Sequence, residues 1–471
     1  MMKNAWHTLV RFLIGLIAFA IPIEHRYDKA FRFFSLTLIP EGLQLPDWFG
    51  KRLYYYPSDC FAILLFLVAA FGVRVPLRKL LWEKGLAIFW LFIVGCGLSI
   101  YASPLYNYPV AYSRLLQLIC AGLIFGTIAS MEGEERTKVA KIVLKSIIIM
   151  ATIQSVIAIA QYFYQAPIGL KKLGEPDFSD IQNFCFILVQ DGVRWTFDRW
   201  QGLSFNTKFV ARVMGTFPHP NVLGGFLTLA SLLSFSFYAQ AEKWKRHVYG
   251  ALISLFLFAM TLTFSRAAIF SFVLGCLVWI YVRKKSSLPT PFLSLSIWVA
   301  SSASVIGFLF HEQLLNRGGI LNYNYFARQS DAYRLFYQNL SFKMIKDHPI
   351  SGVGYNLFTY RLSDYLTPEN NPYGVLGAVH NIYLLICAES GIVSLLLFLT
   401  FLALLFRAFL RASSSPYGAS LLAIFISFLF IGGCDFYPIL FQQGRLMFFL
   451  PFALLAAYGS WEKRRAYAVQ V

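Results

Sequence analysis

The chain has 471 residues, of which 58% are hydrophobic and 14% are charged, and its mean hydropathy is +0.59. A soluble domain carries about 25% charged residues, so this composition excludes an ordinary soluble protein and indicates an integral membrane protein. The formal net charge of +18 comes from short basic groups between apolar runs, which disfavours nucleic acid as a partner and favours membrane topology and an anionic lipid-phosphate ligand.

Twelve hydrophobic runs follow one another along the chain, and each is predicted to be a transmembrane helix. Helices are required because a lone strand leaves its backbone polar groups unsatisfied in lipid. The first run could imitate a signal peptide, but Glu24-His25-Arg26-Tyr27 follows it in place of a small-residue cleavage site. The expected fold is an all-α membrane protein, a single polytopic domain over 1–471. The runs lie near 8–23, 58–74, 85–101, 110–130, 139–165, 220–240, 248–264, 265–282, 292–310, 390–410, 418–433 and 445–460.

Basic residues alternate between the short connections, and this alternation sets the expected orientation. One set of connections is rich in lysine and arginine, whereas the connection 103–109 has none. By the positive-inside rule, the basic set and both termini lie in the cytoplasm, which agrees with an even number of spans. The basic set contains Arg74, Arg78, Lys79, Lys84, Arg136, Lys138, Lys243, Lys245, Arg246, Arg283, Lys284, Lys285, Lys463, Arg464 and Arg465.

Three long segments, 24–57, 166–219 and 311–389, are then expected on the outside. They are also basic, but long loops are translocated largely regardless of charge, so the topology stands. Two explanations of their charge remain open, namely an anionic ligand at the external membrane face and contacts with lipid headgroups.

The third of these segments, between the ninth and tenth expected spans, has the most informative pattern. Residues 327–346 are predicted to form an amphipathic helix, which ends at His348-Pro349 because the residue before a proline avoids the helical region. Gly352 and Gly354 then permit a tight turn. This GxG lacks the strand-to-helix context of a dinucleotide site, so a plain turn is expected.

Three residues beside expected spans are candidates for chemistry. His380 precedes an apolar helix and, as a histidine, suits general-base work on a hydroxyl; the alternative is an interfacial histidine that caps the helix. Arg266 lies between two apolar runs, where its planar group would suit a diphosphate oxygen; the alternative is snorkelling to the interface. His219 is expected to start a helix rather than to act as a catalyst.

Four stretches, in this order, resemble the O-antigen ligase and polymerase superfamily of bacterial membrane glycosyltransferases. The first 150 residues are similar to that family only in hydropathy and topology. The stretches are Arg212 through Gly225 (RVMGTFPHPNVLGG), Thr263 through Ala267 (TFSRA), Arg334 followed by His348 through Phe358 (HPISGVGYNLF), and His380 through Gly391 (HNIYLLICAESG).

The resemblance implies a multi-pass protein of the bacterial inner membrane that takes part in lipopolysaccharide biosynthesis. Such proteins move a glycan from an undecaprenyl diphosphate carrier to an acceptor hydroxyl at the periplasmic face. In the ligase branch, which is the leading expectation, the acceptor is the sugar core of lipid A. The chemistry would be that of an inverting, metal-independent glycosyltransferase without a cofactor. The seven cysteines agree, because none are spaced as in CxxC and no zinc site or disulfide framework is indicated.

The same resemblance assigns roles to residues of this chain. Arg266 and Arg334 match the arginines that bind the carrier diphosphate, and His380 matches the histidine proposed to activate the acceptor hydroxyl. Arg212 and His219 match a more variable motif and are further substrate-binding candidates. The loop 311–389 is expected to carry part of the active site.

Other assignments stay open. A polymerase, whose acceptor is another lipid-linked repeat unit, and a protein O-oligosaccharyltransferase share the same chemistry. A transporter is the alternative from a different class, although transporters usually show broken helices and mid-membrane charges. Glu389 is expected to have a structural capping or pairing role, and Trp195, Trp200 and Tyr355 are candidates for stacking on sugar rings.

Overall fold

In the part of the chain that the computed structural model describes, the protein is a bundle of α-helices with two pairs of very short strands. The structure describes residues 2–22, 56–82, 85–176, 186–188, 196–198, 202–204, 209–285, 291–318, 325–366, 377–413 and 415–458. The helices are α1 (Met2–Ala20), α2 (Pro57–Leu67), α3 (Leu77–Trp82), α4 (Leu86–Ala102), α5 (Pro109–Ala129), α6 (Gly133–Tyr164), α7 (Pro220–Gln240), α8 (Lys243–Leu262), α9 (Arg266–Lys285), α10 (Phe292–Gly318), α11 (Tyr325–Asp347), α12 (Ile382–Ala412), α13 (Pro416–Cys434), α14 (Tyr437–Leu440) and α15 (Gln442–Tyr458).

The expected hydrophobic runs coincide with helices of the bundle. Among the described residues, seven helices are long and apolar enough to cross a membrane, namely α5, α6, α7, α9, α10, α12 and α13. Shorter apolar helices cover Asn4–Ala20, Pro57–Gly72 and Leu86–Ala102. The two other runs, 248–264 and 445–460, coincide with α8 and α15. The chain is therefore a helical, multi-pass membrane protein, as its composition indicates.

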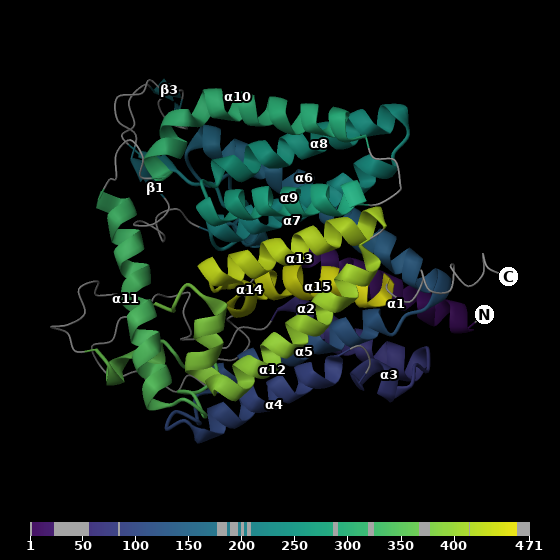
Figure 1. Cartoon of the computed structure of the whole chain (residues 1–471), viewed down its shortest axis with the longest axis vertical. Coiled ribbons are helices and arrows are strands. Elements are labelled where there is room, and N and C mark those ends of the chain that lie inside the picture. The colour runs from purple at the N-terminus through teal and green to yellow at the C-terminus, as the bar shows by residue number, and fades with distance from the viewer. Residues whose placement is uncertain are drawn as a thin grey trace.

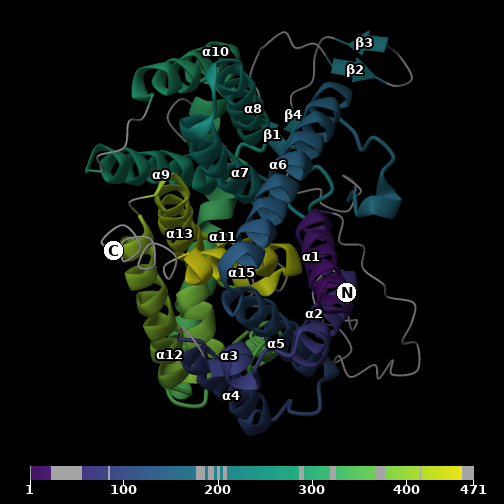
Figure 2. The same cartoon turned by 90° about the vertical axis from the view of Figure 1, so that its right-hand side faces the viewer.

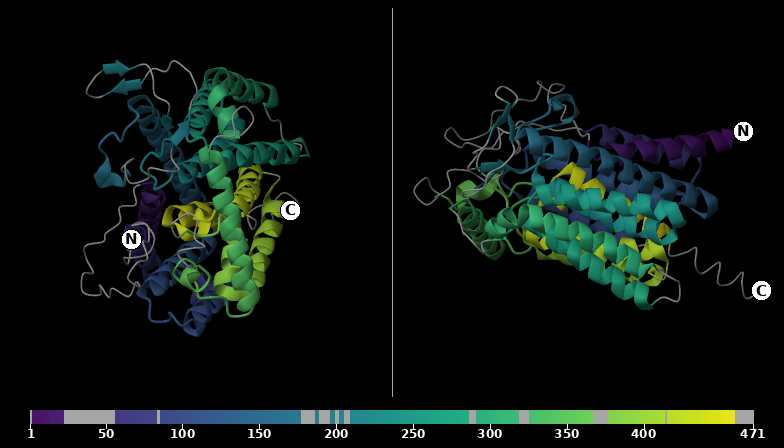
Figure 3. Two further views of the ribbon diagram at one scale, coloured as in Figure 1. Left: turned by 90° about the vertical axis from the view of Figure 1, so that its left-hand side faces the viewer. Right: turned by 90° about the horizontal axis from the view of Figure 1, so that it is seen from above.

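Helix α11 covers one end of the bundle. Figures 1 and 3 show it running across the ends of other helices, while the first residues of α1 lie at the opposite end. Figure 2, turned by 90°, keeps α10 on one flank and α4 on the other, with α13 and α15 between them. The end at which α7, α9 and α12 begin and α13 ends is named the α11 end below.

The amphipathic pattern of residues 327–346 is confirmed as α11. The helix ends at Asp347, directly before His348-Pro349, as expected. Tyr337 and Met344 are buried against the bundle, whereas Phe342 is exposed on the other face. One face of α11 therefore closes the end of the bundle, which places its polar residues next to the ends of α9 and α13.

Helix α7 lies at the centre of the bundle and is buried along nearly its whole length. Its glycines let neighbouring elements approach closely, as is common where membrane helices pack. A Cβ on Gly224 would lie 2.8 Å from the Cβ of Ala268 in α9, and one on Gly225 would lie 1.9 Å from the hydroxyl of Tyr437. The glycines of the VLGG sequence therefore set the spacing of α7 from α9 and α14.

Helix α12 begins at Ile382, before the expected run near 390–410, and is broken at Gly391. Gly391 has φ 79° and ψ 171°, which no L residue adopts readily. The turn after α11 covers the break, because the N–H of residue 353 bonds to the carbonyl of Ala388 at 2.9 Å. The N–H of Gly354 likewise bonds to the carbonyl of Glu389 at 2.9 Å. The backbone groups freed by the break thus find partners within the protein, as a lipid environment requires.

Close packing explains the glycines on both sides of this contact. A Cβ on Gly391 would lie 1.8 Å from the carbonyl oxygen of Ile350, and one on Gly352 would lie 2.3 Å from that of Glu389. Gly352 and Gly354 also have positive φ. The GxG is therefore a turn fitted against a broken helix, in agreement with the plain turn expected from the sequence.

Two antiparallel strand pairs lie in the segment 166–219 and were not expected in an all-α protein. Strand β1 (Phe186–Leu188) pairs with β4 (Phe209–Ala211), and β2 (Thr196–Asp198) pairs with β3 (Gly202–Ser204). Three residues are too few to give a recognisable alternation of apolar and polar side chains. Strand β4 ends at Ala211, directly before Arg212. The pairing of β4 with β1 therefore positions the start of the first motif.

Candidate active site

The four motif stretches of the sequence meet at the α11 end. Arg212 and His219 precede α7, Arg266 begins α9, Arg334 lies in α11, and His380 precedes α12. These residues come from helices that are far apart in sequence. Their meeting is a result of helix packing, and the contacts described next connect them.

Two glutamines of α6 hold the segment that leads into α7. The side-chain oxygen of Gln161 accepts the backbone N–H groups of Met214 and Gly215 at 3.1 and 2.8 Å. The side-chain oxygen of Gln154 accepts the N–H of Thr216 at 2.9 Å. All of these groups are buried, so the bonds fix the path of the chain between Arg212 and α7.

Arg212 links two motif stretches through its guanidinium group. Its Nε donates to the carbonyl oxygen of Thr263 at 2.8 Å, and its Nη2 donates to Oδ1 of Asn221 at 2.7 Å. The side chain is 2% exposed. Arg212 therefore ties the end of α8 to the start of α7.

Asn221 continues this chain of contacts to the end of α13. Its Nδ2 donates to Oδ2 of Asp435 at 2.7 Å, and the other carboxylate oxygen accepts the N–H of Phe436 at 2.8 Å. Asp435 is 4% exposed. Burial alone raises the pKa of this carboxyl, but His380, Arg334, His219 and the Asn221 bond outweigh burial and hold the pKa below its ordinary value. Asp435 is thus a buried carboxylate at the centre of the motif residues.

His380 lies beside this carboxylate. Its ring packs edge-on against Phe436, with ring centroids 4.7 Å apart, and against Tyr333 of α11 at 6.1 Å. The adjacent Asn381 caps α12, because its side-chain oxygen accepts the N–H groups of Tyr383 and residue 384 at 2.9 and 3.0 Å. The capping alternative for His380 is therefore wrong. Its own Nδ1 is buried and has no hydrogen-bond partner among the described residues.

The environment of His380 favours the neutral imidazole. Burial lowers the pKa of His380 to about 4, although the Asp435 carboxylate acts in the opposite direction. A neutral ring has one nitrogen free to accept a proton. The site therefore presents a base at neutral pH, with a negative charge nearby to stabilise the imidazolium that would form.

His219 is the N-cap of α7, as expected for a residue that starts a helix. Its Nδ1 accepts the backbone N–H of Asn221 at 3.1 Å. Burial and the nearby Arg212 lower the pKa of His219 to about 3, so the ring is neutral. Since Nδ1 is the acceptor, the proton must be on Nε2, which makes this side chain a hydrogen-bond donor.

Two arginines at the α11 end differ in their surroundings. Arg266 is paired with Asp331 of α11, with Nη2 2.6 Å from Oδ1, and both side chains are about one-third exposed. Arg266 therefore forms an ion pair with a residue of another helix, which is a different arrangement from a side chain that extends to the lipid interface. Arg334, one turn along α11 from Asp331, donates to the carbonyl oxygen of Cys434 at 3.3 Å. Arg334 is also close enough to influence the pKa of His380.

Asp435 and Asn221 are the members of this group that the sequence analysis did not select. Asn221 lies inside a quoted stretch but has no chemistry that distinguishes it there. Asp435 does carry a usable signal, since a single acid that follows a long apolar run at a membrane boundary is by default a functional candidate.

Other sequence expectations are resolved in part. Tyr355 is 4% exposed and lines an internal cavity, so its ring is not a free stacking platform. Trp195 and Trp200 lie outside the described residues. Glu389 lies two turns into α12, where its Oε1 accepts the N–H of Phe358 at 3.2 Å, a structural role as expected. Among the described residues there is no group of three or more histidine, cysteine or acidic side chains that could hold a metal ion.

Arg266, Arg334 and His380 fall in one continuous stretch of the chain. Residues 250–399 match the O-antigen ligase family. This stretch runs from α8 through the first part of α12 and contains Arg266, Arg334 and His380. Arg212, His219 and Asp435 lie outside it. The resemblance to this family is confirmed over residues 250–399, and the family implies a glycosyltransferase-type membrane enzyme that acts on lipid-linked glycans. No curated protein matches the chain significantly.

Proposed function

We propose that this protein transfers a glycan from an undecaprenyl diphosphate carrier to an acceptor hydroxyl, as an O-antigen ligase does. The main support is the position of His380 and Arg334 beside the Asp435 carboxylate. A neutral base and a cation next to one another suit a reaction in which a hydroxyl loses its proton while negative charge develops on a leaving group.

The proposed reaction is a single displacement at the anomeric carbon of the donor sugar. His380 accepts the proton of the acceptor hydroxyl as the hydroxyl oxygen forms a bond to that carbon. The bond between the carbon and the diphosphate oxygen breaks, and its electron pair leaves with the diphosphate. Attack opposite the leaving group inverts the anomeric configuration.

The charged residues around His380 would stabilise the charges that develop during the reaction. Arg266 and Arg334 would bind the diphosphate oxygens and stabilise the charge that develops on them, by charge-assisted hydrogen bonds. Asp435 would stabilise the imidazolium of His380 without taking its proton. Arg266 is already held by Asp331, so the arginine would reach the substrate without losing its anchor.

We assign different roles to the two candidates before α7. The donors Nε and Nη2 of Arg212 are already bonded to protein groups, so this arginine would position Asn221 and thereby Asp435. His219 donates through Nε2 and would give a hydrogen bond to a sugar or phosphate oxygen. The burial of Arg212 suits a positioning role, whereas His219 is partly exposed, as a residue that contacts substrate must be.

We propose that all twelve expected runs span the bacterial inner membrane, with both termini in the cytoplasm and the α11 end in the periplasm. The start of α8 and the end of α9, with their basic groups at 243–246 and 283–285, lie away from the α11 end. The whole chain would then form one membrane domain, and 311–389 would be its periplasmic loop. This orientation would give the site access to a carrier whose prenyl tail remains in lipid.

The acceptor distinguishes a ligase from the related transferases, and we propose that the acceptor is the core of lipid A. A polymerase and a protein O-oligosaccharyltransferase would use the same residues with a different acceptor. A transporter is less well supported, although α12 is broken, because the break at Gly391 is closed by the turn 349–354 and the motif residues gather at the α11 end.

The proposal is tested in cells of the source bacterium that lack this gene. These cells are complemented with the wild type, with His380→Ala, or with His247→Ala, a control histidine at the start of α8 that lies away from the site. Surface glycolipids are resolved by gel, and undecaprenyl-linked glycan is quantified. Membrane insertion of each variant is measured in the same cells.

A ligase predicts polymer on the carrier and bare acceptor in the deletion and with His380→Ala, and restoration with His247→Ala. Single repeat units on the acceptor would identify a polymerase. Restoration by a stably inserted His380→Ala would remove the base role of His380. Unchanged glycan pools in the deletion would remove the transferase function and make transport the next hypothesis.

A further inference from the structure

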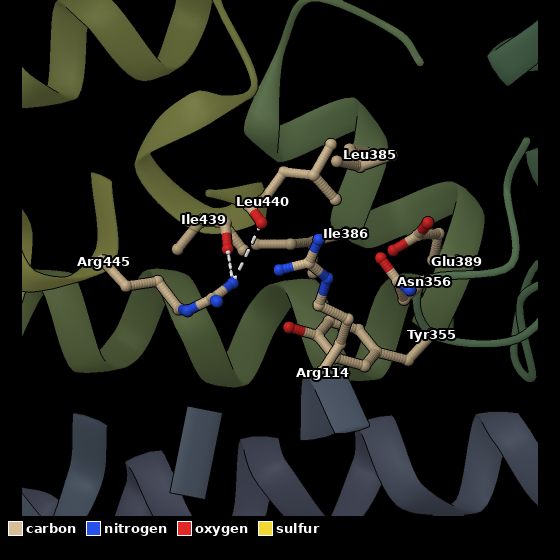
Figure 4. Close-up of a pocket in the computed structure, with 9 residues that line it drawn as sticks. All are labelled: Arg114, Tyr355, Asn356, Leu385, Ile386, Glu389, Ile439, Leu440 and Arg445. Atoms are coloured by element: carbon tan, nitrogen blue, oxygen red, sulfur yellow. Dashed lines mark hydrogen bonds between the residues drawn. The ribbon is translucent and has the colours of Figure 1, made fainter. Parts of the chain in front are cut away.

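A second group of buried charged residues lies beside an internal cavity at the α11 end. The cavity is lined by residues of α5, α12, α14 and α15 and by the turn at residues 355–356 (Figure 4). Its lining includes Arg114, Arg445 and Glu389, and none of the lining residues belongs to the group around His380. The cavity is therefore distinct from the candidate active site.

Arg445 has no donor group to spare for a ligand. Its Nη1 donates to the carbonyl oxygens of Ile439 and Leu440 at 2.6 and 3.1 Å, as Figure 4 shows. Its Nε and Nη2 donate to Gln442 at 3.1 and 2.8 Å, and Nη2 also donates to Gln117. Arg445 thus holds the turn between α14 and α15 in place.

Arg114 is different, because most of its guanidinium group is left free. Within the described part of the chain it makes one hydrogen bond, from Nη1 to the side-chain oxygen of Gln117 at 3.0 Å, and its charge also interacts with the buried carboxyl of Asp59 in α2. Arg114 is 8% exposed. Figure 4 shows its guanidinium group pointing between Arg445 and Glu389, with no bond to any of the residues drawn.

The two neighbouring arginines, Arg114 and Arg445, should destabilise the folded protein when no anion is bound. Gln117 accepts hydrogen bonds from both arginines, so two positive charges are held side by side in a buried place, and one buried acid, Asp59, interacts with both of them. A buried charge that is not fully compensated destabilises a protein, and a single acid cannot fully compensate two buried positive charges. In membrane proteins such residues indicate a functional site.

The size of the cavity limits what can enter it. The cavity has a volume of about 10 Å³, enough for about one water-sized atom, and the empty space around it, about 260 Å³, includes open solvent. A single oxygen atom of a larger group fits the enclosed part, and the rest of that group would lie in the open part. Apolar side chains such as Leu385 and Leu440 form part of the wall, which suits a group attached to a lipid.

We propose that this cavity binds a phosphate group, one oxygen of which accepts hydrogen bonds from the free donors of Arg114. The second positive charge, on Arg445, adds to the attraction without a direct bond. Glu389 lines the same cavity and opposes the anion whenever it is charged. The site does not depend on the transferase function, because it is built from other residues.

Binding is measured on the purified full-length protein in a detergent without phosphate. The probes are inorganic phosphate, dihexanoyl phosphatidic acid, and dihexanoylglycerol, which has the same acyl chains without the phosphate. The dissociation constant of each probe is obtained by titration calorimetry and checked by thermal unfolding. Equal binding of the first two would indicate a site for free phosphate, and binding of the phosphatidic acid alone would indicate a lipid headgroup site.

Two variants, one of a basic residue and one of an acidic residue, test whether the charges of the cavity wall control phosphate binding. Arg114→Gln should weaken phosphate binding by at least about tenfold, the effect of losing a hydrogen bond to a charged group. Glu389→Gln should bind phosphate at least as tightly as the wild type, because it removes only a group that would oppose the anion when charged. Arg246→Gln is the control, since Arg246 lies at the start of α8 away from this end and should not change binding.

The proposal is wrong if neither phosphate probe binds to the wild type, in which case the cavity holds water only. It is also wrong if Arg114→Gln binds as tightly as the wild type. Should that variant unfold, Arg114→Lys takes its place, because it keeps the charge but loses the planar donors and should bind more weakly than the wild type. Weaker binding by a folded Glu389→Gln would also contradict the proposal.

Discussion

Asn221 and Asp435 are joined by a hydrogen bond of 2.7 Å between Nδ2 and Oδ2, although 214 residues separate them. This bond connects the start of α7 to the end of α13, and Arg212 extends it to the end of α8. Around the carboxylate lie His219, at the same start of α7, and His380 and Arg334, which come from two further parts of the chain. The proposed active site is therefore organised around a buried acid.

Replacing His380 should abolish most of the transfer activity. His380→Ala removes the proposed base, and general-base catalysis contributes about 10²–10⁴-fold to a rate. The rate of glycan transfer is measured in proteoliposomes that contain the lipid-linked donor and the acceptor. His247→Ala, away from the site, should keep the wild-type rate. A transfer rate for His380→Ala within a few-fold of the wild type would contradict the base role.

Replacing Asp435 tests whether its charge assists His380. Asp435→Asn keeps the size of the side chain and can still accept the bond from Asn221, but it no longer stabilises the imidazolium. Loss of one such electrostatic partner costs about 10²–10³-fold in kcat. Asp364→Asn is the control, because Asp364 is an exposed acid paired with Arg361. Equal kcat values for Asp435→Asn and the wild type would show that the carboxylate has only a structural role.

The pH dependence of kcat/KM should reflect the lowered pKa of His380. Burial lowers this pKa to about 4, and the active base is the deprotonated form. Activity is therefore retained down through the usual histidine range and is lost only as the pH falls toward about 4. Because Asp435 raises the pKa of His380, Asp435→Asn should move the acid limb to lower pH. An acid limb near 6.5 for the wild type would show that His380 titrates as an ordinary histidine.

Replacing Arg266 or Arg334 should lower kcat more than replacing Asp331, the acid that is paired with Arg266. Arg334→Gln and Arg266→Gln each remove a positive charge from the proposed leaving-group site and should lower kcat by about 10²-fold. Asp331→Asn only loosens Arg266, and a partly exposed ion pair contributes up to about 1 kcal/mol, so its effect should stay below about tenfold. A larger loss for Asp331→Asn than for Arg266→Gln would reverse this assignment.

The broken helix should make Gly391 essential for stability. Gly391→Ala places a methyl group where a Cβ would lie 1.8 Å from a carbonyl oxygen, on a backbone of positive φ. Strain of this kind costs about 1–3 kcal/mol before the clash is added. Gly307→Ala is the matched control, because nothing lies within 4 Å of its Cβ position in α10. Thermal unfolding in detergent should show a large loss for the first variant and none for the second.

Much of the fold follows from local patterns in the sequence. Hydropathy locates the apolar helices, because any segment buried in lipid must be apolar and must satisfy its own backbone. The spacing of apolar residues over 327–346 indicates an amphipathic helix, and Pro349 marks its end. The motif residues Arg266, Arg334 and His380 are also recognisable from the sequence, since their neighbours in the chain belong to the same motifs.

Other features depend on which helices pack together, and no local pattern contains that information. The partner of Arg266 is Asp331, and the partner of Asn221 is Asp435, in each case through contacts between different helices. The break in α12 at Gly391 and the turn that covers it are likewise set by contacts between distant segments. The sequence by itself determined a helical membrane protein and its chemical candidates. Only the tertiary structure decided which charges face each other, because electrostatic and hydrogen-bond partners are chosen by distance in space.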